Sequence, residues 1–261
     1  MDLDLNGRHA LVCGGSEGIG RATALELAQL GANVTLLARR DDALRDAVAS
    51  LPCSGDQQHG YLVADVAQTF ELGQSVAALA MDRPVHILVN NTGGPPGGSA
   101  HAAEIGAYLD AFNKHLIANQ VLLQSVLPGM HSAQWGRIVN VISTSVYEPI
   151  ANLGVSNTIR GAVASWAKTL SRELAADGIT VNNVLPGYTR TQRLEQILAD
   201  RSQASGKSQD EVAKVMLATV PAGRFANAGE VAGMIAYLCS PAAAYVNGQS
   251  IAVDGGRMQS I

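Results

Sequence analysis

The sequence predicts an α/β protein built on a single Rossmann-type doubly wound parallel sheet, with helices on both faces and a small helical lid. Short apolar runs that stop at glycine or asparagine alternate regularly with stretches of helical periodicity. Residues 9–38 contain a strand, a glycine-rich turn, a helix and a second strand, which together form the pattern of a βαβ unit. Because no internal repeat or low-complexity linker interrupts the alternation, we expect one domain over residues 1–261.

The first half of the chain supplies four strands. The run HALVC at 9–13 stops at glycine, as a buried parallel strand does, and the following RATALELAQL has apolar residues at helical spacing. On the same grounds we expect strands at 33–38, 61–64 and 85–90 and helices at 41–51 and 67–81.

The second half continues the alternation around a central strand. Residues 103–130 are expected to form one long helix, and the strand that begins near Ile138 ends at Ser143. The next helix starts at about Ser156. Later elements are a strand at 180–185, a helix at 230–239 and a last strand at 250–253.

The segment 193–224 interrupts this alternation. It predicts two short amphipathic helices around the polar stretch SQASGKSQ. An insertion at the carboxyl edge of a parallel sheet is where a lid over a ligand crevice would lie. The alternative is a surface helical hairpin with no role in binding.

Composition and charge exclude several classes of protein. With 47% apolar and 15% charged residues, the chain has the balance of a compact globule. Its formal net charge of −4 provides no basic face for nucleic acid or anionic lipid. Three cysteines without a CxxC pair argue against a disulfide framework, and no metal site is expected. No run approaches a membrane span and the N-terminus lacks a signal-peptide pattern, so we expect a cytoplasmic protein.

The glycine-rich turn GGSEGIG is a candidate dinucleotide site. Gly14, Gly18 and Gly20 lie where a strand passes into a helix, and Ser16 and Ile19 belong to the same turn. Small residues there let the backbone approach a pyrophosphate, and the helix N-terminus offers unpaired N–H groups. Since glycines also form tight turns without a ligand, this pattern alone does not identify the site.

Five motifs in the same order resemble the short-chain dehydrogenase/reductase family, particularly its 3-oxoacyl-(acyl carrier protein) reductase-like members, over about 250 residues. They correspond to the family patterns TGxxxGxG, an aspartate after the third strand, NNAG, PGxxxT and YVTGxxxxVDGG, with Cys13 here in place of the first threonine. The resemblance implies a nicotinamide cofactor. It assigns to that cofactor Gly14, Ser16, Gly18, Ile19, Gly20, Asp65, Val66, Asn90, Gly93, Arg160, Pro186, Gly187, Thr189 and Thr191.

The residues after the second strand favour NADP(H) over NAD(H). NAD enzymes place a carboxylate at this strand end to hold the ribose 2′-hydroxyl, and here Ala38 stands there, followed by Arg39 and Arg40. A guanidinium suits a 2′-phosphate. Glu17 in the glycine-rich turn points the other way because it adds negative charge nearby, and the two arginines could also be a solvated pair.

The resemblance also implies a catalytic tetrad, of which this chain keeps one member. Ser143 matches the family serine, but Ser156 stands at the tyrosine position, Arg160 at the lysine position and His115 at the upstream asparagine position. In the family the tyrosine donates a proton to the carbonyl oxygen, and a serine hydroxyl is a far weaker acid than a phenol. Arg160 keeps the positive charge and could bind the ribose, but it stays protonated.

Two other residues could supply the acid. Tyr147 lies four residues beyond Ser143 in the loop that borders the substrate in the family, so it provides either the missing phenol or a pocket wall. His115 has an ordinary pKa that suits proton transfer at neutral pH, although a lone histidine on an apolar helix is more often a buried structural residue.

We therefore expect a divergent NADP(H)-dependent oxidoreductase that interconverts a carbonyl and an alcohol with a non-standard active site. A redox-inactive nucleotide-binding or regulatory protein and a non-redox lyase or isomerase on the same scaffold are the alternatives. The expected partner is a small-molecule substrate, and the apolar faces of the lid helices suggest an apolar or acyl one, although lid helices have such faces in any case. From the family we also expect a homo-tetramer.

Overall fold

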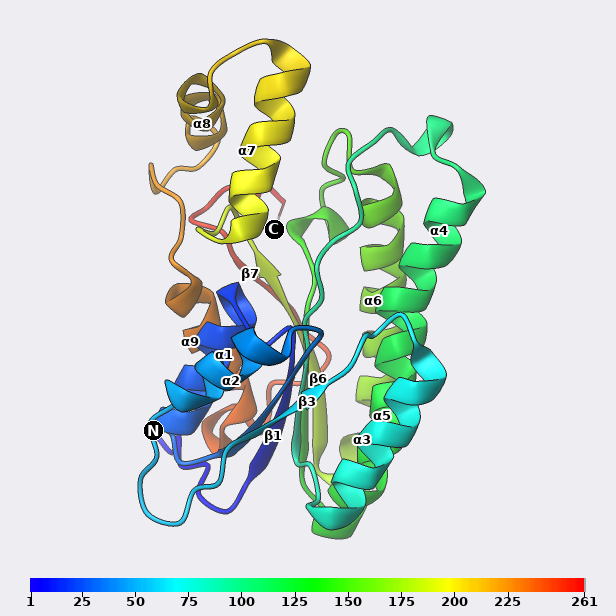
Figure 1. Ribbon diagram of the computed structural model, residues 1–261, viewed down its shortest axis with the longest axis vertical. Helices are drawn as coiled ribbons and strands as arrows, with labels where there is room; N and C mark the ends of the chain where they lie inside the picture. Colours follow the sequence, from blue (N-terminus) through cyan, green and yellow to red (C-terminus); the bar gives the residue numbers. More distant parts are fainter. Residues whose placement is uncertain (261) are drawn as a thin grey trace.

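The computed structural model describes residues 1–260 and contains one parallel seven-stranded sheet, which confirms the predicted architecture (Figure 1). The strand order is β3-β2-β1-β4-β5-β6-β7, so the order reverses between β1 and β4, where α/β proteins of this kind bind nucleotides. The strands are β1 (His9–Cys13), β2 (Asn33–Ala38), β3 (Gly60–Val63), β4 (Ile87–Asn90), β5 (Gly136–Val141), β6 (Ile179–Pro186) and β7 (Ser250–Val253).

Helices cover both faces of the sheet, each above its own apolar cluster. In Figure 1 the layer on one side contains α1 (Gly18–Gln29), α2 (Asp41–Ala49) and α9 (Ala228–Cys239). The layer on the other side contains α3 (Thr69–Asp82), α4 (Ile105–Phe112), α5 (Ala118–Ala133) and α6 (Gly154–Glu173). The two covered faces explain why β1, β4 and β5 are buried along their whole length, whereas the edge strand β3 alternates between half-buried and exposed residues.

The expected long helix at 103–130 is observed as an unbroken helical segment over 105–133, but with one irregular turn inside it. Residues Asn113–Ile117 form a π-helical turn between α4 and α5, and Ala100–Ala102 form a separate 3-10 turn. A π turn inserts one extra residue and shifts the register of the residues after it, a local change that the prediction of one regular helix does not include. Its consequence is local, because it turns the side chain of His115 toward the carboxyl end of β4.

Several other boundaries differ from expectation by one or two residues, and two of the differences concern the site. Strand β5 ends at Val141, so Ser143 lies in the loop after the strand and caps the short turn Thr144–Val146. In the lid, α7 (Gln192–Ser205) runs through the first half of the polar stretch that was expected to separate the helices, and α8 (Gln209–Leu217) follows. Figure 1 shows both lid helices above the carboxyl ends of the strands.

A row of side-chain amides crosses the sheet in its core. Asn90 on β4 donates to Asn140 on β5, Asn140 donates to Asn183 on β6, and Asn183 donates to Ser250 on β7 at 2.8, 2.9 and 3.0 Å. Each donor and acceptor in this row is also a direct cross-strand partner. The row therefore joins four strands by side chains as well as by backbone.

Within residues 1–260, none of the helices is both long and apolar enough to cross a membrane.

Candidate cofactor and catalytic site

The glycine-rich turn packs more closely than any other residue type would allow. A Cβ on Gly20 would stand 2.1 Å from the carbonyl oxygen of Gly14, and one on Gly14 would stand 2.6 Å from that of Asn91. Gly14 and Gly18 also have positive φ angles of 59° and 56°. The side chain of Glu17, the N-cap of α1, makes no capping hydrogen bond, so the first N–H groups of α1 remain available to a phosphate.

A cavity of about 440 Å³ lies at the carboxyl ends of β2 and β3, against the start of α3. Arg39 and Asp65, two residues predicted to bind the cofactor, both line it, and Asp65 is oriented by accepting a hydrogen bond from the Ala67 N–H at 2.9 Å. A guanidinium and a carboxylate on one cavity fit a nucleotide whose ribose carries a phosphate and whose base carries an amino group.

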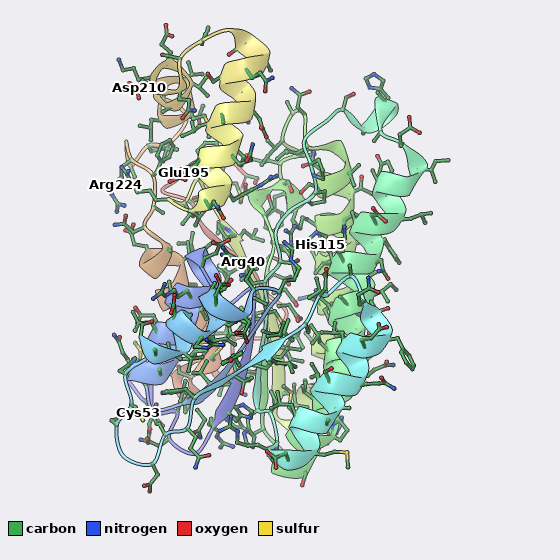
Figure 2. The ribbon with its side chains drawn as sticks, viewed as in Figure 1. Arg40, Cys53, His115, Glu195, Asp210 and Arg224 are labelled. Carbon is green, nitrogen blue, oxygen red and sulfur yellow. The ribbon has the colours of Figure 1, made fainter. Side chains whose placement is uncertain are left out.

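The two neighbouring arginines have different environments. Arg40 Nη2 lies 3.0 Å from Glu17 Oε2, in an exposed ion pair that joins the residue after β2 to the glycine-rich turn. Arg39 takes part in none of the ion pairs among residues 1–260. Glu17, which we expected to oppose a phosphate, is thus neutralised by Arg40, and Arg39 keeps its charge for a ligand. Figure 2 shows Arg40 on the α1–α2 side of the sheet.

In the NNTG segment after β4, the two asparagines bond to other parts of the fold and the glycine is exposed. Asn90 is buried and donates one hydrogen bond within the amide row, while its Oδ1 has no hydrogen-bond partner among residues 1–260. Asn91 donates to the carbonyl oxygens of Cys13 and Gly14 and so fixes the glycine-rich turn. Gly93 is exposed, with open space around the position of a Cβ.

The segment from Pro186 to Thr191 packs against the C-terminal VDGG motif. A Cβ on Gly187 would stand 2.6 Å from the Cα of Asp254, which requires glycine there. Thr189 is buried and its hydroxyl donates to the Gly187 carbonyl, while the Thr191 hydroxyl donates to that of Thr189. Thr191 also contacts Gly18, so the predicted nicotinamide side and pyrophosphate side of the site adjoin.

The loop after β5 holds Ser143 and Tyr147. The Ser143 hydroxyl accepts a hydrogen bond from the Ser145 N–H at 3.1 Å, which orients it. The Tyr147 side chain is 52% exposed and its hydroxyl has no hydrogen bond with the rest of residues 1–260. Ser156, in the first turn of α6, is buried close to the same loop, yet it has no hydrogen-bond partner among those residues that would make it a stronger acid.

Arg160 and His115 meet at Thr92. The Arg160 guanidinium is 7% exposed and donates to the carbonyl oxygens of Val141 at 3.2 Å and Thr92 at 3.4 Å. His115 Nδ1 lies 2.7 Å from the Thr92 hydroxyl. Figure 2 shows His115 on the side of the crevice formed by α5 and α6.

This environment sets the charge of both groups. Burial, together with the positive charge of Arg193, lowers the pKa of Arg160 to about 10, so the guanidinium is charged at neutral pH. Burial and the adjacent Arg160 lower the pKa of His115 to about 3. Because His115 is therefore neutral at pH 7, its environment does not fit the expectation that it acts as a general acid.

Three polar residues of the crevice were missed from the sequence. Thr92 stands where the family pattern NNAG has alanine, and that exchange was a readable signal. Arg193 at the start of α7 donates to the Pro95 carbonyl at 3.0 Å. Arg257 donates to the Thr144 hydroxyl at 3.3 Å and lies 4.7 Å over the Tyr188 ring. Neither arginine carries a sequence signature, because each contacts a segment about 100 residues away along the chain.

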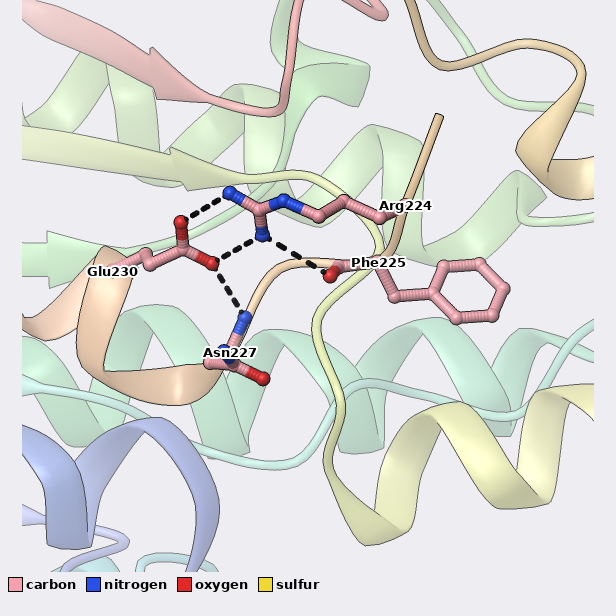
Figure 3. Close-up of polar contacts among 4 residues, drawn as sticks. All are labelled: Arg224, Phe225, Asn227 and Glu230. Atoms are coloured by element: carbon pink, nitrogen blue, oxygen red, sulfur yellow. Dashed lines mark hydrogen bonds and ion pairs between the residues drawn. The ribbon is translucent and has the colours of Figure 1, made fainter. Parts of the chain in front are cut away.

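The lid is held to the sheet by its own core and by an ion pair. The buried residues Leu194, Val212, Met216 and Phe225 pack on one another, with Tyr188 edge-on to Phe225. These contacts account for the buried apolar residues of the lid helices, whereas Val215 on α8 is 60% exposed. At the end of the lid, both Nη atoms of Arg224 bond to Glu230, which also accepts from the Asn227 N–H (Figure 3).

Comparison with known proteins agrees with this geometry. A family model described as Enoyl-(Acyl carrier protein) reductase matches residues 14–257. The chain is 35% identical to a putative ketoacyl reductase of Streptomyces coelicolor, covering 95% of both chains. It is 33% identical to the 3-oxoacyl-(acyl-carrier-protein) reductase of Pseudomonas aeruginosa, covering 99% of this chain and all of the other. The crystal structure of L-sorbose reductase from Gluconobacter frateurii, complexed with NADPH and L-sorbose, superposes over both full chains with a TM-score of 0.92 at 27% identity.

Proposed function

Since the chain belongs to the short-chain dehydrogenase/reductase family, we propose that it is an NADP(H)-dependent oxidoreductase that interconverts a carbonyl and an alcohol with a non-standard active site. The observation that carries the proposal is the cavity lined by both Arg39 and Asp65, together with the close-packed glycine-rich turn between β1 and α1. The L-sorbose reductase that superposes on the chain was crystallised with NADPH, which supports the same cofactor here.

The residues of the chain fit such a cofactor. The close approach of Gly14 and Gly20 leaves backbone N–H groups of α1 open to a pyrophosphate, and Arg39 supplies the positive charge for a 2′-phosphate. Pro186, Gly187, Thr189 and Thr191 form the nicotinamide side of the site. When bound, the cofactor supplies or accepts the hydride.

The remaining chemistry concerns the substrate oxygen. In the reducing direction the carbonyl carbon gains a hydride and its oxygen gains a proton. We assign Ser143, oriented by the Ser145 N–H, to hold this oxygen, and Tyr147 in the same loop to donate the proton. Arg160 lies at the carboxyl ends of β4 and β5, where its charge stabilises developing negative charge and its guanidinium can bond to the ribose.

A second function is favoured by one specific observation. Neither Ser156 nor Arg160 reproduces the phenol–ammonium pair of the family, and no phenol is hydrogen-bonded to Ser143 or Arg160 among residues 1–260. A redox-inactive protein that binds NADP(H) for sensing or assembly would need only the cofactor half of the site. In this alternative, Arg39 still binds the 2′-phosphate, but Tyr147 donates no proton.

The assembly is part of the same proposal. Ile105 and Leu109 on α4 are 78% and 66% exposed and lie one helical turn apart, which is unusual for large apolar side chains of a monomer. A homo-tetramer that covers α4 would bury them. Light scattering coupled to size exclusion measures the assembly, and a monomer would contradict it.

The buried Cys13 and Cys239 are free thiols, which agrees with a cytoplasmic protein.

The experiment that tests the function is a fluorescence titration with NADPH and NADH, followed by NADPH oxidation with a panel of ketones, aldehydes and oxo acids. Binding of NADPH with turnover of one class of carbonyl supports the oxidoreductase. Binding without turnover of any carbonyl supports the redox-inactive reading. Failure of both cofactors to bind at millimolar concentration contradicts both.

A further inference from the structure

Two arginines from different helices approach each other at the mouth of the crevice. Arg160 on α6 and Arg193 on α7 each have Nη2 3.8 Å from the point where a Cβ on Gly94 would stand. Both donate to carbonyl oxygens of the loop after β4, Arg160 to Thr92 and Arg193 to Pro95. The loop therefore holds two guanidinium groups near one glycine.

Neither charge is balanced within residues 1–260. None of the four ion pairs there includes Arg160 or Arg193, and the acceptors of both groups are uncharged carbonyls. Arg160 is buried and Arg193 is half-buried, so water screens their repulsion only in part. Nearby His115 is neutral. Two like charges held close in a partly dry site are unfavourable unless an anion binds between them.

The position of Arg193 favours an anion on the substrate over one on the cofactor. The phosphates of the cofactor are assigned to the glycine-rich turn and to Arg39, on the α1–α2 side of the sheet. Arg193 instead points across the crevice and bonds to Pro95, on the loop that leads toward α4. It also follows Thr191, on the nicotinamide side of the site, by two residues, which places its charge close to the reacting carbonyl.

We propose that Arg193, next to Arg160, binds a carboxylate carried by the substrate, so that the substrate is an oxo acid and the product the corresponding hydroxy acid. This inference rests on the proposed oxidoreductase function. A guanidinium fork matches a carboxylate in two parallel hydrogen bonds, which gives both affinity and orientation. Because Arg193 belongs to the lid helix α7, binding of the carboxylate also ties the lid to the substrate.

The experiment compares acids with esters in matched variants. Turnover of 2-oxobutanoate and 4-oxopentanoate is measured against that of their methyl esters, with NADPH, in the parent protein, in Arg193→Gln and in Arg201→Gln. Arg201 lies two turns further along the same helix. Its replacement by glutamine removes the same charge at a position away from Gly94. We expect the parent to prefer one acid to its ester by at least tenfold in kcat/KM.

In Arg193→Gln we expect the KM for that acid to rise about 10- to 100-fold, with the KM for the ester and for NADPH unchanged, and Arg201→Gln to match the parent. Equal turnover of acid and ester in the parent would overturn the proposal. So would a rise in the KM for NADPH in Arg193→Gln, because the arginine would then serve a cofactor phosphate.

A binding measurement separates this inference from the proposed function. Calorimetric titration of the same acid into the protein saturated with NADP⁺ needs no turnover. Binding that is lost in Arg193→Gln and retained in Arg201→Gln supports the carboxylate site even if no carbonyl is reduced. Absence of binding in the parent overturns the site, even if another carbonyl is turned over and the oxidoreductase function stands.

Discussion

The Nδ1 atom of His115 lies 2.7 Å from the hydroxyl of Thr92, and both residues depart from the family patterns that the rest of the chain follows. The exchange of alanine for Thr92 and that of asparagine for His115 are linked, because the two new side chains form a pair. A threonine after Asn90-Asn91 brings a hydroxyl under the crevice, and a histidine at the asparagine position gives that hydroxyl a partner. The π-helical turn Asn113–Ile117 orients the imidazole for this contact.

The first prediction concerns pH. Since burial lowers the pKa of His115 to about 3 from its ordinary value of 6.5, the unfolded chain binds a proton that the folded chain does not. The free energy of unfolding should therefore fall as the pH drops from about 6.5 toward 4. His115 contributes up to about 1.4 kcal/mol per pH unit, and His9, whose pKa burial lowers to about 4, adds to the slope.

Urea denaturation at several pH values, in the parent and in His115→Asn, measures this slope. We expect the variant to show a shallower dependence below pH 6.5. His101→Asn, which alters an exposed histidine, should follow the parent curve. An unchanged slope in His115→Asn would mean that the imidazole is protonated in the folded protein.

Arg39→Gln should separate the two nicotinamide cofactors. Loss of one charge-assisted contact to a 2′-phosphate weakens binding by about 1.5–3 kcal/mol, so the Kd for NADPH should rise about 10- to 100-fold while that for NADH stays constant. Fluorescence titration measures both constants. Arg45→Gln is the control, because Arg45 is paired with Asp41 on the exposed surface of α2, and its effect should stay below about threefold. Equal weakening of both cofactors in Arg39→Gln would contradict the assignment.

Tyr147→Phe tests the proton donor. Removal of a general acid lowers kcat about 10²- to 10⁴-fold, and because the ring is kept, the Kd for NADPH should not change. Steady-state turnover with the best carbonyl from the panel checks this. Tyr245→Phe removes a hydroxyl from a fully exposed ring and should retain the parent rate. Full turnover in Tyr147→Phe would show that Tyr147 is a pocket wall and that the proton comes from water.

Gly20→Ala should disrupt the glycine-rich turn. Its Cβ would stand 2.1 Å from the Gly14 carbonyl oxygen, which cannot move without displacing β1 from α1, so we expect a loss of about 1–3 kcal/mol or more in the free energy of unfolding. Gly233→Ala in α9 meets nothing within 4 Å and should gain about 1 kcal/mol from helix propensity. Similar stability of the two variants in thermal denaturation would refute the close packing.

The pattern of apolar residues was sufficient to predict the strands of the sheet. It was not sufficient to predict which side chains meet in the crevice. The strands 9–13, 33–38 and 250–253 were predicted with their observed bounds because short apolar runs between turns leave few alternatives. The π turn was not predicted because it changes the register at one point of an otherwise unbroken helical segment. Arg193 and Arg257 escaped because a side chain that donates to a distant carbonyl or hydroxyl imposes no requirement on neighbouring sequence.

The amide row through Asn90, Asn140 and Asn183 limits which relatives can be joined into one chimaeric protein. Each asparagine meets its partner only when β4, β5 and β6 are aligned as they are here, and a slip of one residue would separate both amide pairs. In a chimaera that takes β1–β4 from one relative and β5–β7 from another, positions 90 and 140 come from different parents. The two residues must still form the hydrogen bond seen here between Asn90 and Asn140. Parents with an apolar residue on one side of that junction should yield poorly folding hybrids, whatever their sequence identity elsewhere.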